Sequence, residues 1–194
     1  ENIRSARPGK DLQLSIDRRI QYLAYRELKA AVKSHKARSG SLVVLDSRSG
    51  EVLALVNQPA FNPNNRRHLE SSRLRNRAVT DVFEPGSTMK PFMVAAALET
   101  GGYSSATRID TAPGLLQVGV HTVRDMHDYG VLDLTGVLRK SSNVAASKIA
   151  LSLDPQYLWE VLTSAGLGTS TASGFPGEAD GYLAGYRRWR DIEK

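Results

Sequence analysis

Apolar residues recur at helical spacing near the start of the chain and then gather into two short, continuous runs. A stripe at helical spacing follows Ser15 or Asp17, either of which can cap a helix, and comprises Ile16, Ile20, Leu23, Ala24, Leu28, Ala31 and Val32. It predicts an amphipathic helix that ends near His35, with the whole stripe in the core. The runs 42–45 and 52–56 flank a Gly-containing turn and predict a β-hairpin. Because neither run alternates with polar residues, we expect helices on both faces of the sheet.

Polar segments follow the hairpin. Residues 57–65 are rich in Asn and Pro and predict a loop. The next segment, 66–77, is interpreted as a helical surface that packs toward the loop before Ser87, and its arginines are Arg66, Arg67, Arg73, Arg75 and Arg77. A groove for single-stranded nucleic acid would interleave aromatic side chains with these arginines for base stacking, and none is present. We therefore expect no nucleic-acid partner.

Helical patterns dominate the second half. The apolar run 93–98, with Pro91 in the first turn and Gly101 as the stop, predicts a helix that begins close to Ser87. Asp133 opens a short helix that leads into Lys140.

Two further helices and a strand complete the pattern. Helices are predicted over 144–153 and, after the cap Asp154 and Pro155, over 156–165 with Gly166 as the stop. The alternation of apolar and polar residues over 116–122 predicts one short exposed strand. Residues 166–194 are glycine-rich and irregular.

Composition narrows the class of protein. With 194 residues, 41% hydrophobic and 24% charged, the chain suits one well-buried domain. The net charge of +6 suits an anionic partner such as a membrane surface or an acidic polymer, or simple solvation. The absence of cysteine excludes disulfides and thiolate metal sites. Histidines do not show a metal-ligand spacing, so we expect no metal and no cofactor: His35, His68, His121 and His127.

The ends of the sequence suggest a piece of a longer protein. Glu1 is not a natural start, and no apolar run approaches the ~18 residues of a membrane helix. We therefore expect residues 1–14 to be a linker from an absent N-terminal region, with a membrane anchor further upstream.

Ser87 and Lys90 form the first candidate motif. Their spacing of three places them on one helix face. A lysine can take a serine's proton only when it is neutral, and lowering its pKa from ~10.4 to ~7–8 costs about 4 kcal/mol. A helix terminus supplies only ~0.3–1 kcal/mol, so desolvation or a second cation must supply most. We therefore expect Lys90 to point into a closed pocket. Ser-x-x-Lys alone is also typical of solvated helix positions.

Ser141 and Asn143 form the second candidate motif, between two predicted helices. A hydroxyl here could carry a proton from the lysine to a leaving amine, and the carboxamide could hold a substrate amide. By itself, Ser-x-Asn is also the composition of an ordinary turn.

Taken together, the motifs resemble those of the active-site serine penicillin-binding proteins, D,D-transpeptidases that share a fold with serine β-lactamases. The resemblance is carried by 84–91 (Glu-Pro-Gly-Ser-Thr-Met-Lys-Pro) and 140–143 (Lys-Ser-Ser-Asn), with 75–78 and 174–178 in support. It runs from about Gly9 to the end and is closest to the class B, cell-division type, similar to penicillin-binding protein 3. It implies an α/β (α+β) fold with an antiparallel sheet and helices on both faces, in which 15–194 is the N-terminal portion of a transpeptidase domain.

The resemblance also implies roles. Ser87 would be the acylated nucleophile, with its N–H as half of an oxyanion hole, and Lys90 its general base. Ser141 would shuttle the proton, and Asn143 would contact the peptide. The implied partners are a peptidoglycan stem peptide ending in D-Ala–D-Ala, β-lactams, and division-complex proteins. The implied location is the periplasmic face of the bacterial inner membrane.

One departure matters. The family's third motif, Lys-Ser/Thr-Gly on a strand, should follow Asn143 and is missing. Arg38-Ser39-Gly40 and Arg48-Ser49-Gly50 are similar in composition but lie upstream, where we interpret them as turns. The sheet would lack its C-terminal strands, so we expect these residues to be inactive alone. Alternatives are a serine β-lactamase, a non-catalytic β-lactam sensor, and a division scaffold with the same fold.

Overall fold

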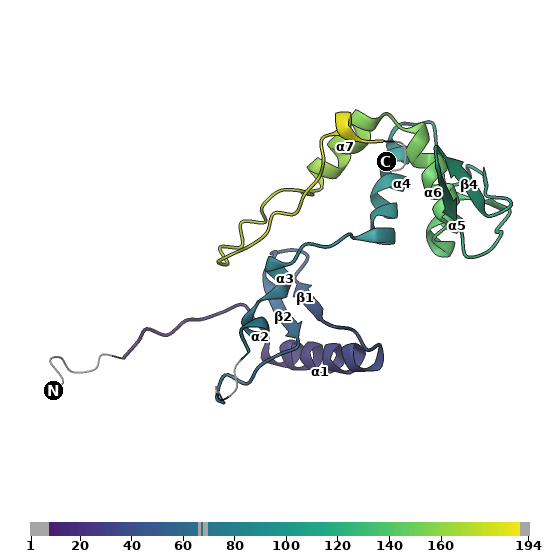
Figure 1. Cartoon of the computed structure of the whole chain (residues 1–194). Coiled ribbons are helices and arrows are strands. Elements are labelled where there is room, and N and C mark those ends of the chain that lie inside the picture. The colour runs from purple at the N-terminus through teal and green to yellow at the C-terminus, as the bar shows by residue number, and fades with distance from the viewer. Residues whose placement is uncertain (1–7, 66, 68–69, 191–194) are drawn as a thin grey trace. The chain divides into compact units, whose positions relative to one another are not determined.

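The structure, a computed structural model, describes residues 8–65, 67 and 70–190. Arg66, His68 and the first seven residues of the predicted linker lie outside the described residues. The chain divides into two compact units, residues 1–81 and 82–194. Figure 1 shows the elements of both.

The first unit is built on one long helix and a hairpin. It contains α1 (Arg18–Ser34), β1 (Gly40–Leu45), β2 (Val52–Gln58), α2 (Ser71–Leu74) and α3 (Arg77–Thr80). Asp17 is the N-cap of α1, because its carboxylate accepts from the backbone N–H groups of Arg19 at 2.7 Å and Ile20 at 3.2 Å. The helix and the hairpin are therefore those that the sequence predicts. Residues 8–14 are exposed and form neither helix nor strand.

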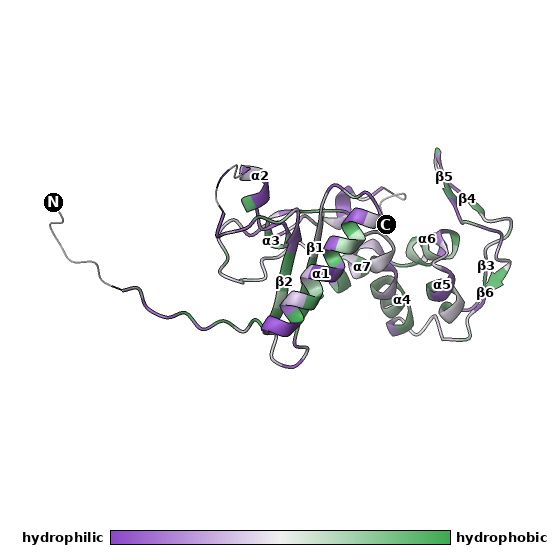
Figure 2. Ribbon diagram, turned by 90° about the horizontal axis from the view of Figure 1, so that it is seen from below, coloured by the Kyte–Doolittle hydropathy of each residue, from purple (hydrophilic) through white to green (hydrophobic). Residues whose placement is uncertain are grey.

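The core of the first unit lies between α1 and one face of the hairpin. Ala24, Ala54 and Val56 are buried, and partly buried side chains pack around them: Ile20, Leu28, Leu42 and Val44. Figure 2 shows hydrophobic and hydrophilic positions alternating along α1. The predicted stripe was too wide, because Leu23 is 48% exposed and Ala31 is also exposed. A two-stranded hairpin covers only the narrow row of positions spaced four residues apart.

The opposite face of the hairpin meets α3. The Asn57 side chain accepts from Ala78 N at 2.8 Å and donates to Asn76 Oδ1 at 2.7 Å. Helices therefore lie against both faces, although α3 reaches only one end and leaves Val43 and Leu45 exposed. The arginine-rich segment forms α2 and α3 rather than one helix.

Arginines of this segment pair within the unit. Arg75 and Arg77 both bind Asp81, at 2.7 and 3.0 Å, and Arg73 pairs with Glu70 at 3.1 Å. These pairs offset part of the positive charge of the segment. The predicted packing toward the loop before Ser87 would join the two units, and it stays a prediction.

The second unit contains a helical core and two small strand pairs. Its elements are η1 (Gly86–Met89), α4 (Lys90–Glu99), β3 (Ile109–Asp110), β4 (Leu115–Val118), β5 (His121–Arg124), β6 (Val131–Leu132), α5 (Leu134–Lys140), α6 (Asn143–Ser152), α7 (Pro155–Ser164) and η2 (Tyr186–Arg188). Strand β3 pairs with β6 and β4 with β5, both antiparallel. The predicted stops are confirmed, because Gly101 and Gly166 follow α4 and α7 with φ of +72° and +87°.

The prediction of a single strand over 116–122 is wrong. The segment is the β4–β5 hairpin, in which Val118 pairs with His121 across the two-residue loop 119–120. Gly119 has a φ of +56°, which glycine adopts readily. The chain therefore turns at Gly119, although the apolar and polar residues go on alternating through this position.

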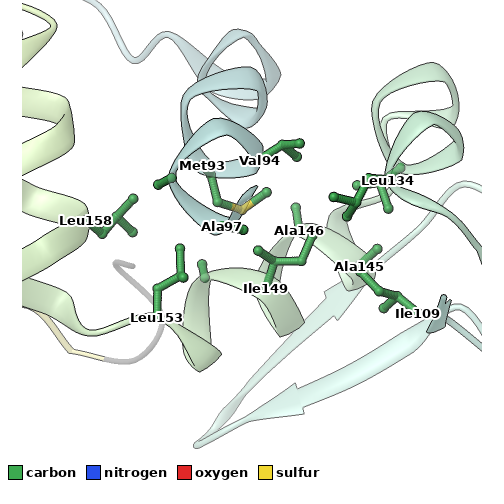
Figure 3. Packing of buried hydrophobic residues seen from close by; sticks show 13 residues of the cluster. Met93, Val94, Ala97, Ile109, Leu134, Ala145, Ala146, Ile149, Leu153 and Leu158 are labelled. Atoms are coloured by element: carbon green, nitrogen blue, oxygen red, sulfur yellow. The ribbon is translucent and has the colours of Figure 1, made fainter. Parts of the chain in front are cut away.

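Helices α4, α5, α6 and α7 share one apolar core, shown in Figure 3. Ala96 and Ala97 of α4 and Ile149 of α6 are fully buried. Their neighbours in the cluster include Met93, Val94, Val137, Ala145, Leu153 and Leu158. The small alanine side chains let α4 and α6 approach each other closely. This packing fixes the N-terminal ends of the two helices, and these ends carry the candidate motifs. Among the helices of the described residues, none has the length and apolar character needed to cross a bilayer.

Candidate active site

Ser87 lies in the tight turn that leads into α4. Gly86 enters the turn with a φ of +61°, and the Thr88 hydroxyl donates to the carbonyl oxygen of Pro85 at 2.6 Å. The turn is the 3₁₀ helix η1, and α4 begins at Lys90 with Pro91 in its first turn, as the missing proline N–H predicts. Ser87 is exposed at this end of the helix.

The second motif occupies the break between α5 and α6. Ser141 ends α5 in the left-handed region with a φ of +53°, and Ser142 is the N-cap of α6. The buried Ser142 hydroxyl accepts from Ala145 N at 2.9 Å. This backbone reversal is the loop between helices that the sequence predicts.

Lys90 joins the two motifs. Its Nζ donates to the Ser141 carbonyl oxygen at 2.6 Å, the Ser141 hydroxyl at 3.0 Å and Asn143 Oδ1 at 2.7 Å. Residues more than fifty positions apart in sequence thus share one hydrogen-bonded cluster. The Asn143 amide is oriented at both ends, because its Nδ2 donates to the Arg124 carbonyl oxygen at 2.9 Å.

Asp125, directly after β5, was not among the predicted site residues. Its Oδ1 accepts from the backbone N–H groups of Asn143 and, at 3.0 Å, Val144, while its Oδ2 accepts from the Ser142 hydroxyl at 2.6 Å. The sequence offers only a weak signal for this residue, a carboxylate three positions after the alternating stretch 116–122. The residues near Asp125 in the sequence do not indicate that its hydrogen-bond partners lie 17 to 19 positions away.

The electrostatics of Lys90 follow the predicted direction. Desolvation lowers the pKa of Lys90 below its ordinary value, and the negative charge of Asp125 opposes that change. Lys90 is half-buried, short of the closed pocket that we expected. A lowered pKa increases the fraction of neutral amine, the form that can accept a proton.

Ser87 stands apart from this cluster in one respect. Among the described residues, its hydroxyl makes no hydrogen bond, to Lys90 or to any other group. The structure therefore brings together Lys90, Ser141 and Asn143, with Ser87 three residues before the lysine on an exposed turn.

The remaining motifs are structural. In the β1–β2 turn, Asp46 accepts from the N–H groups of Arg48 and Ser49, so 48–50 is a turn as interpreted. The Arg38-Ser39-Gly40 segment leads into β1, where a Cβ on Gly40 would stand 2.9 Å from Val32 Cγ2, so glycine permits the close approach to α1. Within the described part of the chain, no group of three or more His, Asp and Glu side chains gathers to hold a metal ion.

Comparison with known proteins shows which family and which relatives the chain resembles. The family model described as "Penicillin binding protein transpeptidase domain" matches residues 40–194. The chain is 47% identical over 186 residues to the "Probable peptidoglycan D,D-transpeptidase PenA" of Neisseria gonorrhoeae, covering 96% of this chain and 32% of that protein. It is 46% identical over 184 residues to the "Peptidoglycan D,D-transpeptidase FtsI" of Escherichia coli K12, covering 95% of this chain and 31% of that protein.

A solved structure agrees with these relatives. The apo transpeptidase domain of Burkholderia pseudomallei penicillin-binding protein 3 aligns with a TM-score of 0.82 and 42% identity, over 96% of this chain and 52% of that one. The chain spans about a third of the length of the curated relatives it matches.

Proposed function

The chain belongs to the penicillin-binding protein transpeptidase family, and from that premise we propose that its protein crosslinks peptidoglycan stem peptides through an acyl-enzyme on Ser87. The observation that carries the proposal is the triple contact of Lys90 Nζ with Ser141 and Asn143, which assembles both sequence motifs into one cluster. The relatives named D,D-transpeptidases support the reaction class.

The proposed chemistry assigns one task to each group. Lys90, once neutral, takes the proton of the Ser87 hydroxyl as that oxygen attacks the carbonyl carbon of the D-Ala–D-Ala bond. The Ser141 hydroxyl, 3.0 Å from Lys90 Nζ, passes the proton to the departing amine of the terminal D-Ala. Asn143 holds a peptide amide, and the Ser87 N–H is one donor to the developing oxyanion. An amine of a neighbouring stem then attacks the ester, which forms the crosslink and frees Ser87.

The lack of a hydrogen bond between the Ser87 hydroxyl and Lys90 among the described residues sets a requirement for the proposal. Catalytic hydrogen bonds are often long in free enzymes and tighten with substrate. Because Lys90 Nζ is bound to the second motif, the proposal requires the Ser87 hydroxyl to turn toward the lysine on binding. An exposed serine in a helical turn has the rotamer freedom to do so.

The wider setting is part of the proposal. By family, the partners are peptidoglycan and β-lactams, and we propose septal cell-wall synthesis with division-complex proteins, on the periplasmic face of the inner membrane. We also propose that residues 1–14 are a linker and that 15–194 is the N-terminal portion of the catalytic domain.

The test is covalent labelling of the full gene product with a fluorescent penicillin. We expect stable label on Ser87, mapped by mass spectrometry, and complete loss of label in Ser87→Ala with an unchanged melting temperature, because an exposed hydroxyl contributes little to stability. Ser105→Ala, at another exposed serine, is the matched control and should label normally.

Further outcomes separate the alternatives. Fast release of the label would indicate a β-lactamase. Stable label without crosslinking of stem peptides would indicate a sensor or scaffold. Label that persists in Ser87→Ala would dismiss Ser87 as the nucleophile.

A further inference from the structure

We propose that Asp125 is a positioning residue for this site, and that its carboxylate, held on the β4–β5 hairpin, fixes the Ser141–Asn143 turn against Lys90. The inference rests on the proposed function, because it assigns Asp125 to the same site. It concerns a residue outside both sequence motifs.

Three hydrogen bonds carry the proposal. The two oxygens of Asp125 together engage three consecutive residues, through the Ser142 hydroxyl and the N–H groups of Asn143 and Val144. The first N–H groups of an α-helix lack partners within the helix, so Asp125 satisfies donors at the start of α6. Asn143 then reaches back to the Arg124 carbonyl oxygen at 2.9 Å. The start of α6 and the end of β5 are thus linked twice: the Asp125 side chain binds the backbone of α6, and the Asn143 side chain binds the backbone of β5.

A purely local capping role does not account for this arrangement. Helices α1, α5 and α7 are each capped by an aspartate that directly precedes the helix: Asp17, Asp133 and Asp154. Helix α6 already has such a cap in Ser142. Asp125 adds to that cap from a different element, and so it couples the hairpin to the turn that holds Lys90.

The position of the turn decides where Lys90 points. Ser141 supplies two of the three acceptors of Lys90 Nζ and Asn143 the third. Ser141 has a φ of +53°, a conformation that disfavours most side chains and needs external support. Ser142, the residue between the two acceptors, is fully buried and bound to Asp125. Loss of the carboxylate would therefore free the turn and disperse the acceptors of the lysine.

The charge of Asp125 gives a second, separable effect. Its negative charge raises the pKa of Lys90, against the stronger lowering by desolvation. Other charged or titratable groups on the surrounding elements are Glu99 on α4, His121 and Arg124 on β5, Arg139 and Lys140 on α5, Lys148 on α6, and Tyr157 and Glu160 on α7. Among the charged groups of the described residues, Asp125 is the one whose charge shifts the pKa of Lys90.

The experiment compares three variants of the full gene product by the rate of acylation with a fluorescent penicillin across pH. Asp125→Asn keeps an acceptor oxygen and removes the charge. We expect its acid limb to move to lower pH than in the unmodified protein, because Lys90 loses a proton more easily. Asp125→Ala removes the acceptors as well, and we expect acylation to slow by about 10- to 100-fold through misplacement of the turn.

Asp128→Asn is the matched control. Asp128 lies three residues further along the same segment, where its carboxylate accepts, among the described residues, from Gly130 N alone, at 2.9 Å. We expect no change in either the rate or the pH profile. A thermal melt of each variant separates slow acylation from unfolding, and Asp125→Asn provides the pH readout even where Asp125→Ala folds poorly.

The outcomes separate this inference from the proposed function. An Asp125→Asn profile that superimposes on that of the unmodified protein overturns the inference, as does normal acylation in folded Asp125→Ala. Absence of any label in the unmodified protein overturns the proposed function instead.

Discussion

The two units of the chain use their apolar residues in different ways. In residues 1–81, one strongly amphipathic helix lies on a two-stranded hairpin, and the buried cluster consists of Ala24, Ala54 and Val56. In residues 82–194, helices α4 and α6 show little amphipathic pattern, and they pack with α5 and α7 into a larger cluster centred on fully buried residues such as Ile149. The candidate active site lies at helix ends of the second unit, where both motifs are held by the same core.

The comparison shows that a clear amphipathic pattern is not a measure of burial. The pattern of α1 is the easiest to read in the sequence, yet Leu23 is 48% exposed. The Ala-rich helix α4 shows no stripe, yet Ala96 and Ala97 are fully buried. Burial of α4 is nevertheless one-sided, because Phe92 and Leu98 are 39% and 41% exposed. A stripe states only which side of a helix is available for packing, and an apolar helix without a stripe is buried on the side that meets its neighbours.

The largest effect should follow from Lys90→Arg, which changes the group that joins the motifs. A guanidinium cannot act as a base near neutral pH, so acylation by a fluorescent penicillin should slow by about 10²- to 10⁴-fold. Lys148→Arg is the matched control, since Lys148 donates to the Asp110 carbonyl oxygen at 2.7 Å and not to the site. Acylation at the normal rate in Lys90→Arg would remove the lysine from its proposed role.

An intermediate effect should follow from Ile149→Ala in the shared core. Ile149 is fully buried, so the change should lower the free energy of unfolding by about 2–5 kcal/mol in a denaturant titration. Val120→Ala, at the hairpin tip where Val120 is 90% exposed, should change it little. Equal stability of the two variants would mean that the core of the second unit is not the one described.

The smallest effect should follow from Asp17→Ala in the first unit. Loss of the cap should destabilise α1 by about 1 kcal/mol, measured as faster amide hydrogen exchange in residues 18–34. Acylation should keep its rate, because Asp17 belongs to the unit without the candidate site. A matching loss of acylation would show that the two units are energetically coupled.

Local signals in the sequence predicted most helix ends. Asp17, Pro91, Asp154 and Gly166 each act on the backbone within a few residues, so their effect does not depend on the rest of the fold. The same reasoning placed Ser141 and Asn143 in a turn between two helices. These elements were predictable because sequence neighbours determine them.

The remaining features depend on distant residues. Asp125 binds groups 17 to 19 positions away, and only the tertiary fold brings the β4–β5 hairpin beside α6. The exposure of Leu23 depends on how much of α1 the hairpin covers. The spacing of Ser87 and Lys90 predicted a contact between them, but three oxygens at the second motif bind the lysine instead.

The three oxygens around Lys90 Nζ also determine what its deprotonation does to the network. An ammonium group has three N–H bonds, and here each has its own acceptor. A neutral amine has two N–H bonds and a lone pair. In one of the three contacts the neighbouring group must therefore donate a hydrogen bond to the amine nitrogen. The carbonyl oxygen of Ser141 and the amide oxygen of Asn143 can only accept, whereas the Ser141 hydroxyl can rotate and donate. Ser141 is therefore the one neighbour of the three that can follow the lysine through a full protonation cycle without losing its hydrogen bond.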